Sequence, residues 1–161
     1  MHPNEHLLRK LFQCLNSHDH QGMMNCYHKD ATFRDIAFVL TNREDIQAMW
    51  EMICSDNEKG PSDIVATVQE VEADDESGRT MIIDDYTLRE TGNKVHNKIK
   101  SSFTFRDGLI FRQEDACDSV RWANQAFGKL LGFLPGRIFF IRHFIAMWTL
   151  RKYKASKKRT N

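Results

Sequence analysis

Apolar residues in the first third of the chain recur at the spacing of one helix face. This periodicity predicts a helix around residues 7–15, a short second helix around residues 23–27 and a third around residues 46–53. Between the second and third helices, residues 31–38 (ATFRDIAF) are rich in β-type side chains, which predicts a short strand. Asp35 lies inside this apolar stretch, so a carboxylate is expected among buried side chains.

From residue 64 onward the pattern changes to the alternation that is typical of β-strands. Four segments separated by short polar turns predict an antiparallel meander over residues 64–73, 80–90, 94–105 and 109–117. Helical periodicity then returns. It predicts a helix over residues 118–133, stopped by Pro135, and a last helix over residues 136–154 that is followed by a disordered basic tail.

Helices that precede a run of strands predict an α+β domain, in which the helices pack on one face of a curved antiparallel sheet. A cone of this shape encloses an internal pocket, and pockets with apolar walls hold small molecules. We therefore expect a pocket domain over residues 1–134 and a helical extension with a basic tail over residues 135–161.

Strand alternation separates an inward face from an outward face in the two central strands. In the strand over residues 94–105, the inward face holds Val95, Asn97, Ile99, Ser101, Phe103 and Phe105. In the strand before it, the inward face holds Ile82, Asp84, Tyr86 and Leu88. Asp84 is the one charged member of these two faces.

The register of the last strand depends on the turn at residues 106–108 (RDG). A three-residue turn closed by Gly108 pairs Phe105 with Leu109. It turns inward the side chains of Leu109, Phe111, Gln113, Asp115 and Cys117. A two-residue turn instead turns inward those of Ile110, Arg112 and Glu114. We prefer the three-residue turn, because the alternative would bury two unlike charges.

Asp35, Asp84 and Asp115 are thus all expected on apolar faces. A buried carboxylate without a partner is costly, and its pKa rises so that the group can stay neutral. A carboxyl group with a raised pKa is suited to general acid or base catalysis. The alternative is structural: each aspartate lies near a strand end and accepts hydrogen bonds from the backbone or from Tyr86. Both interpretations stay open at this point.

The charged residues are distributed unevenly along the chain. All 22 acidic residues lie at or before Asp118, whereas 10 of the 23 basic residues follow it, so residues 1–118 carry a net charge of −9. A basic end can contact an anionic membrane surface or nucleic acid, and it also keeps a chain soluble. The apolar run at residues 138–148 fits an amphipathic helix that lies across the pocket mouth, completes a dimer or rests on a membrane.

Several other kinds of site are not indicated. The four cysteines form no Cys-x-x-Cys pair and are expected as free thiols. His18 and His20 are too close in sequence to share one helix face, so no metal site is expected. The chain has neither a Gly-rich phosphate loop nor a Gly-x-Ser-x-Gly motif, and no cofactor is expected. The N-terminus lacks the apolar core of a signal peptide, so a cytoplasmic location is expected.

Two stretches of the chain resemble one known family. Residues 6–38 (HLLRKLFQCLNSHDHQGMMNCYHKDATFRDIAF), followed by NREDIQAMWEM, are similar to the opening of SnoaL-like proteins. Residues 95–128 (VHNKIKSSFTFRDGLIFRQEDACDSVRWANQAFG) are similar to uncharacterised bacterial members. These proteins belong to the nuclear transport factor 2-like and ketosteroid isomerase-like superfamily. The resemblance implies a cystatin-like cone around a pocket, and often a dimer.

The resemblance also implies roles for single residues. Asp35 matches the proton-shuttling base of ketosteroid isomerases, whereas Leu11 and Ser101 match the two positions of their oxyanion hole. Because Leu11 cannot donate a hydrogen bond, ordinary steroid isomerisation is not expected. Asp84 and Asp115 match the aspartates of limonene epoxide hydrolases, in which an arginine stands at the position of Ile82. SnoaL-type cyclases use one pocket aspartate near the position of Asp115.

We therefore predict a protein that binds a lipophilic small molecule in an internal pocket. Asp115 and Asp35 are predicted to catalyse proton transfer of isomerase, cyclase or hydrolase type, without a cofactor. The predicted binding residues are Asp84, Ser101, Trp50, Tyr86, Phe103, Phe111 and Gln113. The alternative is a non-catalytic ligand-binding or dimeric interaction module with structural aspartates. We further expect a homodimer, weak membrane-surface contact through the basic tail, and no specific nucleic acid.

Overall fold

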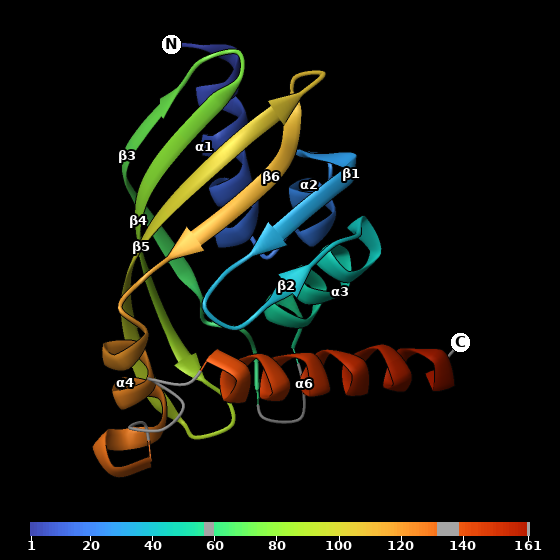
Figure 1. The fold of residues 1–161 in the computed structure, drawn as a ribbon. Helices are drawn as coiled ribbons and strands as arrows, with labels where there is room; N and C mark the ends of the chain where they lie inside the picture. Colours follow the sequence, from blue (N-terminus) through green and yellow to red (C-terminus); the bar gives the residue numbers. More distant parts are fainter. Residues whose placement is uncertain (57–59, 132–138, 161) are drawn as a thin grey trace.

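The computed structural model describes residues 1–56, 60–131 and 139–160 of the protein. Its centre is a curved, open sheet of six strands in the order β2-β1-β6-β5-β4-β3 (Figure 1). β1 pairs in parallel with β6, and the other neighbouring strands pair antiparallel. The elements are α1 (Pro3–Asn16), α2 (His20–Met24), β1 (Tyr27–Arg34), β2 (Val39–Leu40), α3 (Arg43–Cys54), β3 (Val65–Ala73), β4 (Ser77–Leu88), β5 (Asn93–Arg106), β6 (Leu109–Ala116), α4 (Ser119–Leu131) and α6 (Phe139–Thr160).

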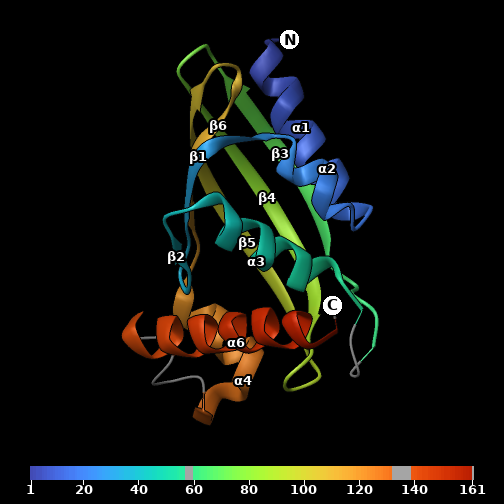
Figure 2. The same cartoon turned by 90° about the vertical axis from the view of Figure 1, so that its right-hand side faces the viewer.

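Helices α1, α2 and α3 cover one face of the sheet, and the hydrophobic core lies between these two layers (Figure 2). This arrangement confirms the predicted α+β fold. The inward residues of β4 and β5 are buried or half-buried, as strand alternation predicted. The core includes Leu8, Leu11 and Leu15 of α1, Phe33 of β1, Met49 of α3, Ile82 of β4, Phe103 of β5 and Ile110 of β6.

The segment that was expected as one strand over residues 31–38 forms the end of β1 and the turn that joins β1 to β2. β1 ends at Arg34, and β2 pairs back on β1 from Val39. Asp35 starts the turn, in which its backbone N–H donates to the Phe38 carbonyl oxygen at 3.0 Å. An aspartate can bind nearby backbone N–H groups, which competes with the hydrogen bonds of a strand. The other end also differs, because Tyr27 begins β1 rather than belonging to the second helix.

The prediction of a three-residue turn before β6 is wrong. Arg106 pairs with Leu109 across a two-residue turn, in which Asp107 and Gly108 have positive φ angles of 53° and 71°. Two consecutive positive φ angles are characteristic of a type I′ turn, whose twist matches that of a β-hairpin. Asp-Gly is one of the preferred sequences for this turn, so the local sequence favours the shorter loop.

Because of a β-bulge at Phe111, the second half of β6 nevertheless directs Gln113 and Asp115 inward, as expected. Ile110 and Arg112 pair with consecutive residues of β5, which leaves Phe111 as an extra residue. Ile110 is therefore buried before the bulge, and Gln113 is buried after it. Asp115 shares the face of Gln113, while Arg112 stays exposed. The bulge thus avoids the buried charges that argued against the two-residue turn.

The C-terminal part of the chain forms α4 and α6 at one end of the sheet (Figure 1). α4 is interrupted at Gly128, whose φ of 81° and ψ of 158° are not helical. The stop predicted at Pro135 lies outside the described residues. α6 continues to Thr160, so the prediction of a disordered tail after residue 154 is wrong. Within the described parts of the chain, no helix is long and apolar enough to cross a membrane.

Ion pairs to α3 explain why the basic end of α6 stays helical. Lys154 Nζ lies 2.9 Å from Glu44 Oε1 and 2.7 Å from Asp45 Oδ1. Lys157 pairs with Glu51, nearly two helical turns further along α3. These contacts give the C-terminal half of α6 a fixed partner, which the sequence pattern of the tail alone does not reveal.

Candidate functional site

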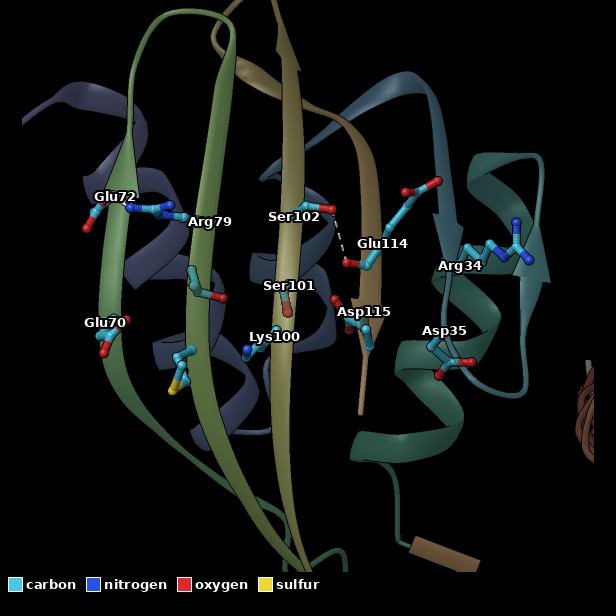
Figure 3. Close-up of a pocket in the computed structure, with 13 residues that line it drawn as sticks. Arg34, Asp35, Glu70, Glu72, Arg79, Lys100, Ser101, Ser102, Glu114 and Asp115 are labelled. Atoms are coloured by element: carbon cyan, nitrogen blue, oxygen red, sulfur yellow. Dashed lines mark hydrogen bonds and ion pairs between the residues drawn. The ribbon is translucent and has the colours of Figure 1, made fainter. Parts of the chain in front are cut away.

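A row of polar side chains crosses the sheet on its inward face. Thr80 of β4 pairs with Ser101 of β5, and Ser101 pairs with Asp115 of β6. The parallel register of β1 and β6 brings Asp35, the residue that follows β1, beside Asp115 (Figure 3). The fold therefore brings together the two predicted catalytic aspartates and the predicted binding residue Ser101.

Asp115 is the end point of a chain of hydrogen bonds that starts in the core. The indole Nε1 of Trp50 donates to the Tyr27 hydroxyl at 3.2 Å, and Tyr27 donates to Gln113 Oε1 at 2.5 Å. Gln113 Nε2 then lies 3.0 Å from each carboxylate oxygen of Asp115. An indole N–H can only donate, so the direction of the later bonds is fixed and the amide NH₂ group of Gln113 must face Asp115.

Opposing effects bring the pKa of Asp115 close to neutrality. Burial raises this pKa most strongly, whereas the neighbouring side chains of Ser101 and Gln113 lower it. The negative charge of Asp35 raises it further, and the resulting pKa is about 7. Asp115 can therefore take up or release a proton at neutral pH.

Asp84 is a second inward carboxyl group with a raised pKa. It is 8% exposed on β4, opposite Asn97 of β5. Burial, followed by the charges of Asp115 and Asp85, raises its pKa to about 7. Because the negative charge of Asp115 raises the pKa of Asp84, ionising both carboxyl groups costs more free energy than ionising one of them.

Three buried oxygen atoms near these carboxyl groups lack a well-formed hydrogen bond to any described residue. They are Asp84 Oδ1, Thr80 Oγ1 and Ser101 Oγ. Native proteins leave few buried polar atoms unpaired, and each one calls for an explanation such as a water molecule or a ligand. These three atoms therefore mark the inward side of the polar row as a candidate binding place.

Asp35 is fixed by the backbone of its own turn. Its Oδ1 accepts the N–H groups of Ala37 at 2.7 Å and Phe38 at 2.5 Å. Burial raises the pKa of Asp35, and the two backbone hydrogen bonds lower it. Arg142 and His143, both on α6, lower it further, but burial outweighs these effects and the pKa of Asp35 stays above its ordinary value. Its carboxylate is thus already used in holding the turn.

The first half of α6 docks on this same turn. Arg142 Nε donates to the Ile36 carbonyl oxygen at 2.8 Å, and His143 Nδ1 lies 2.9 Å from the Ala37 carbonyl oxygen. Both views show α6 lying across the end of the sheet, close to the loop between β1 and β2 (Figures 1 and 2). The extension therefore covers the end of the polar row at which Asp35 lies.

A hollow of about 700 Å³ opens on the other face of the sheet, over the same strands (Figure 3). Thr80, Ser101, Asp35 and Asp115 border it, but alternation turns the side chains of Thr80 and Ser101 inward. The exposed side chains around it are mostly charged: Arg34, Glu70, Glu72, Arg79, Lys100 and Glu114. This hollow lies on the outer face among charged side chains, so it is not the apolar internal pocket that was expected, which stays a prediction.

Two of the predicted aromatic walls belong to the core. Trp50 packs edge-on against Phe33 at a centroid distance of 5.8 Å, and Phe103 is buried beside Gln113. Tyr86 is half-buried at the edge of the site, where its hydroxyl accepts Trp122 Nε1 at 2.7 Å. Of the three, Tyr86 is the one with surface left for a ligand.

Phe111 lies away from the polar row, although it was predicted as a wall of the pocket. Its ring packs edge-on against His28 at 5.8 Å between centroids, and the Arg106 guanidinium lies 3.6 Å from its ring centre. The physical reason is the bulge, which makes Phe111 the extra residue and turns it away from the face of Gln113.

Some residues of the site escaped the sequence analysis. Tyr27 was assigned to a helix, and its role depends on a contact with Gln113 that is distant in sequence. Thr80 shares the parity of Asp84, so strand alternation could have placed it on the inward face as well. Arg142 and His143 were visible as interruptions of an apolar run, but the pattern did not show what they bind.

The described residues contain no group of three or more His, Cys, Asp or Glu side chains that could hold a metal ion.

The model of the SnoaL-like domain matches residues 8–113, which is most of the chain. The chain belongs to the SnoaL-like domain family. The matched region of this SnoaL-like protein contains Asp35, Asp84 and Ser101, and it ends at Gln113, two residues before Asp115. No curated protein sequence matches the chain.

Solved structures share the fold of this SnoaL-like protein at low sequence identity. An LEH-like epoxide hydrolase of M. tuberculosis is 12% identical, with a TM-score of 0.65, over 82% of this chain and 95% of its own. An NTF2-like protein of unknown function from Burkholderia pseudomallei is 12% identical, with a TM-score of 0.67, over 79% and 99%. A protein with a ketosteroid isomerase-like fold from Catenulispora acidiphila, in complex with trimethylamine, is 11% identical, with a TM-score of 0.63, over 74% and 91%. At these identities the likeness shows the fold alone.

Proposed function

We propose that this SnoaL-like protein is a cofactor-independent enzyme that moves a proton on a small molecule, with Asp115 as its acid/base group. The observation that carries the proposal is the state of the Asp115 carboxyl group. It faces inward, it is oriented by Gln113, and its pKa is about 7. A catalytic acid or base works best when its pKa lies near the operating pH.

The proposed reaction begins with Asp115 in its ionised form. Asp115 removes a proton from the carbon that lies between a carbonyl group and a C=C bond, and the electron pair of the broken C–H bond delocalises onto the carbonyl oxygen as a dienolate. Asp115 then returns the proton to the far carbon of that C=C bond, so that the product is an isomer with its double bond conjugated to the carbonyl group. Ser101 is the proposed hydrogen-bond donor to the dienolate oxygen, and neutral Asp84, four residues further along the sheet, is the proposed donor to a second polar group of the substrate.

The electrostatics of the two carboxyl groups support this division of roles. The negative charge of Asp115 raises the cost of ionising Asp84, which favours a state in which Asp115 is ionised and Asp84 keeps its proton. In that state one carboxyl group is a base and the other a donor. Asp35 is assigned an electrostatic role, because its Oδ1 already accepts two backbone N–H groups.

The proposed substrate has a carbonyl oxygen and a mostly apolar body. Half-buried apolar side chains adjoin the carboxyl groups and support this class. Ile99 is the inward residue next to Ser101 on β5, and Phe38 closes the turn of Asp35. Tyr86 is the inward residue next to Asp84 on β4, close enough for an ionised Asp84 to raise the pKa of Tyr86. Such side chains can cover an apolar ligand while leaving its oxygen to the polar row.

A matched pair of variants on β6 tests the proposal. Wild type, Asp115→Asn and Glu114→Gln are compared on a panel of lipophilic β,γ-unsaturated ketones. Loss of the acid/base group should lower kcat by about 100-fold or more, whereas Glu114→Gln alters an outward, exposed side chain and should leave kcat unchanged. For the wild type, kcat/KM should rise with pH through about 7, because the ionised form of Asp115 is the base. Turnover that survives Asp115→Asn contradicts the proposal.

A non-catalytic ligand-binding role is the second candidate, and the bonding of Asp35 favours it. That carboxylate holds its own turn, as a structural aspartate does. Calorimetric titration with the same panel separates the two candidates. A compound that binds wild type and Asp115→Asn equally, with no turnover by either, supports a binding module.

A further inference from the structure

Helix α6 exposes large apolar side chains on the side that faces away from the protein. Its inner side carries Arg142, which is only 9% exposed and donates to a backbone carbonyl of the β1–β2 loop, and Leu150, which is buried in the core. On the opposite side, the large apolar side chains are exposed: Phe140 78%, Phe144 71%, Ile145 42% and Trp148 51%. A helix that merely covers a domain keeps its large apolar side chains on the inward face.

The exposed face changes from apolar to basic along the helix. Residues three or four positions apart share a helix face, so Phe140, Phe144 and Trp148 continue into Arg151 and Lys152. Lys152 Nζ lies 3.6 Å from the centre of the Trp148 ring, which joins the two parts. We call this set the outer stripe of α6: Phe140, Phe144, Ile145, Trp148, Arg151 and Lys152.

The basic residues of α6 fall into two groups according to the side on which they lie. Lys154 and Lys157, on the inner side, pair with acidic residues of α3. Arg151 and Lys152 are exposed, and neither forms an ion pair with another described residue. The cations that dock the helix are thus neutralised, whereas those of the outer stripe leave an uncompensated positive charge.

We propose that the outer stripe of α6 binds the surface of an anionic phospholipid membrane, with the helix lying in the plane of the interface. Exposed aromatic and aliphatic side chains can enter the boundary between head groups and acyl chains. Tryptophan favours that boundary because its ring is apolar and its N–H is polar. Arg151 and Lys152 then contact lipid phosphate groups. The proposal is independent of the proton-transfer function.

Charge favours lipid over a second copy of the same helix. No acidic residue follows Asp118 in the sequence, so a second α6 offers no counter-charge to Arg151 and Lys152. An anionic lipid surface offers many. It also offers an apolar layer that both Phe140 and Phe144 can enter, because the helix lies parallel to the membrane surface.

Vesicle co-sedimentation tests the proposal with the full chain. Wild type should bind vesicles with about 30% phosphatidylserine in phosphatidylcholine, and bind pure phosphatidylcholine much more weakly. Arg151→Gln/Lys152→Gln should weaken binding about 25-fold, or roughly fivefold for each cation removed. Phe144→Ser/Trp148→Ser should abolish it. Lys94→Gln/Lys98→Gln, which removes two exposed cations of β5, should bind like wild type and so controls for net charge.

Tryptophan fluorescence gives a second readout at the proposed contact. Trp50 is buried and Trp122 half-buried, whereas Trp148 is exposed. Anionic vesicles should therefore shift the emission of Trp148 to shorter wavelength. Trp148→Phe should keep most of the binding and lose the shift, because the apolar ring is retained.

Three results would overturn the proposal. One is binding that does not depend on phosphatidylserine, and another is binding that the outer-stripe variants leave unchanged. The third comes from sedimentation velocity: a wild-type dimer that Phe144→Ser/Trp148→Ser converts to a folded monomer assigns the stripe to a second copy. The homodimer expected from the sequence stays a prediction, and this last measurement tests it directly.

Discussion

The side-chain amide of Gln113 lies 3.0 Å from each carboxylate oxygen of Asp115. The same amide accepts a hydrogen bond from Tyr27, so that a buried core residue determines how Asp115 is held. This relationship depends on the bulge at Phe111, because an unbroken alternation from the turn would have presented Arg112 and Glu114 instead. A local irregularity of one strand thereby decides which side chains form the polar row.

Removal of the Tyr27 hydroxyl should destabilise the protein. In Tyr27→Phe the N–H of Trp50 and the Oε1 of Gln113 both lose their buried partner, and each such loss costs about 1–3 kcal/mol. Urea unfolding measures the change in the free energy of unfolding. Tyr153→Phe is the control, because its hydroxyl makes no hydrogen bond to a described residue. Equal effects of the two substitutions on the free energy of unfolding would contradict the chain of hydrogen bonds through Tyr27.

Asp84 should make the protein less stable at about pH 8 than at about pH 5. Its pKa is 3.8 in the unfolded chain and about 7 in the folded one. Between these values the unfolded state releases a proton that the folded state keeps, so the free energy of unfolding falls as pH rises. The fall is at most about 1.4 kcal/mol for each pH unit, and it ends above the folded pKa.

Urea unfolding from about pH 4 to about pH 9 checks this prediction. Asp84→Asn should reduce the decline in the free energy of unfolding and raise the stability at the alkaline end. The part of the decline that is due to Asp115 should remain. Glu70→Gln, which alters an exposed side chain of β3, should keep the wild-type slope. A slope that Asp84→Asn does not change would show that Asp84 ionises normally in the folded protein.

Arg142→Ala should loosen the contact between α6 and the β1–β2 loop. The substitution removes the hydrogen bond to the Ile36 carbonyl and a positive charge that lowers the pKa of Asp35. Amide hydrogen exchange in residues 139–150 should accelerate by about tenfold, and the pKa of Asp35 should rise. Arg151→Ala, on the exposed side, should change neither. Unchanged exchange in Arg142→Ala would mean that other contacts hold the helix.

Local patterns in the sequence were sufficient for the main elements and for part of the site. Strand alternation placed Asp84 and Ser101 on the inward face, because the direction of a strand side chain depends only on its parity. The family resemblance added the curved sheet with its covering helices. The same local reasoning failed at the last hairpin, where one extra residue, Phe111, reverses the parity within the strand.

The sequence by itself thus determined which side chains each strand directs inward, and that three aspartates would be among buried neighbours. Only the tertiary structure decided that Asp35 lies beside Asp115, because this depends on the parallel pairing of β1 with β6, about 80 residues apart in the chain. It also decided that Arg142 faces the protein while Phe144 faces solvent. Periodicity reports the spacing between neighbours in sequence, whereas the orientation of a helix is set by the partners it meets in space.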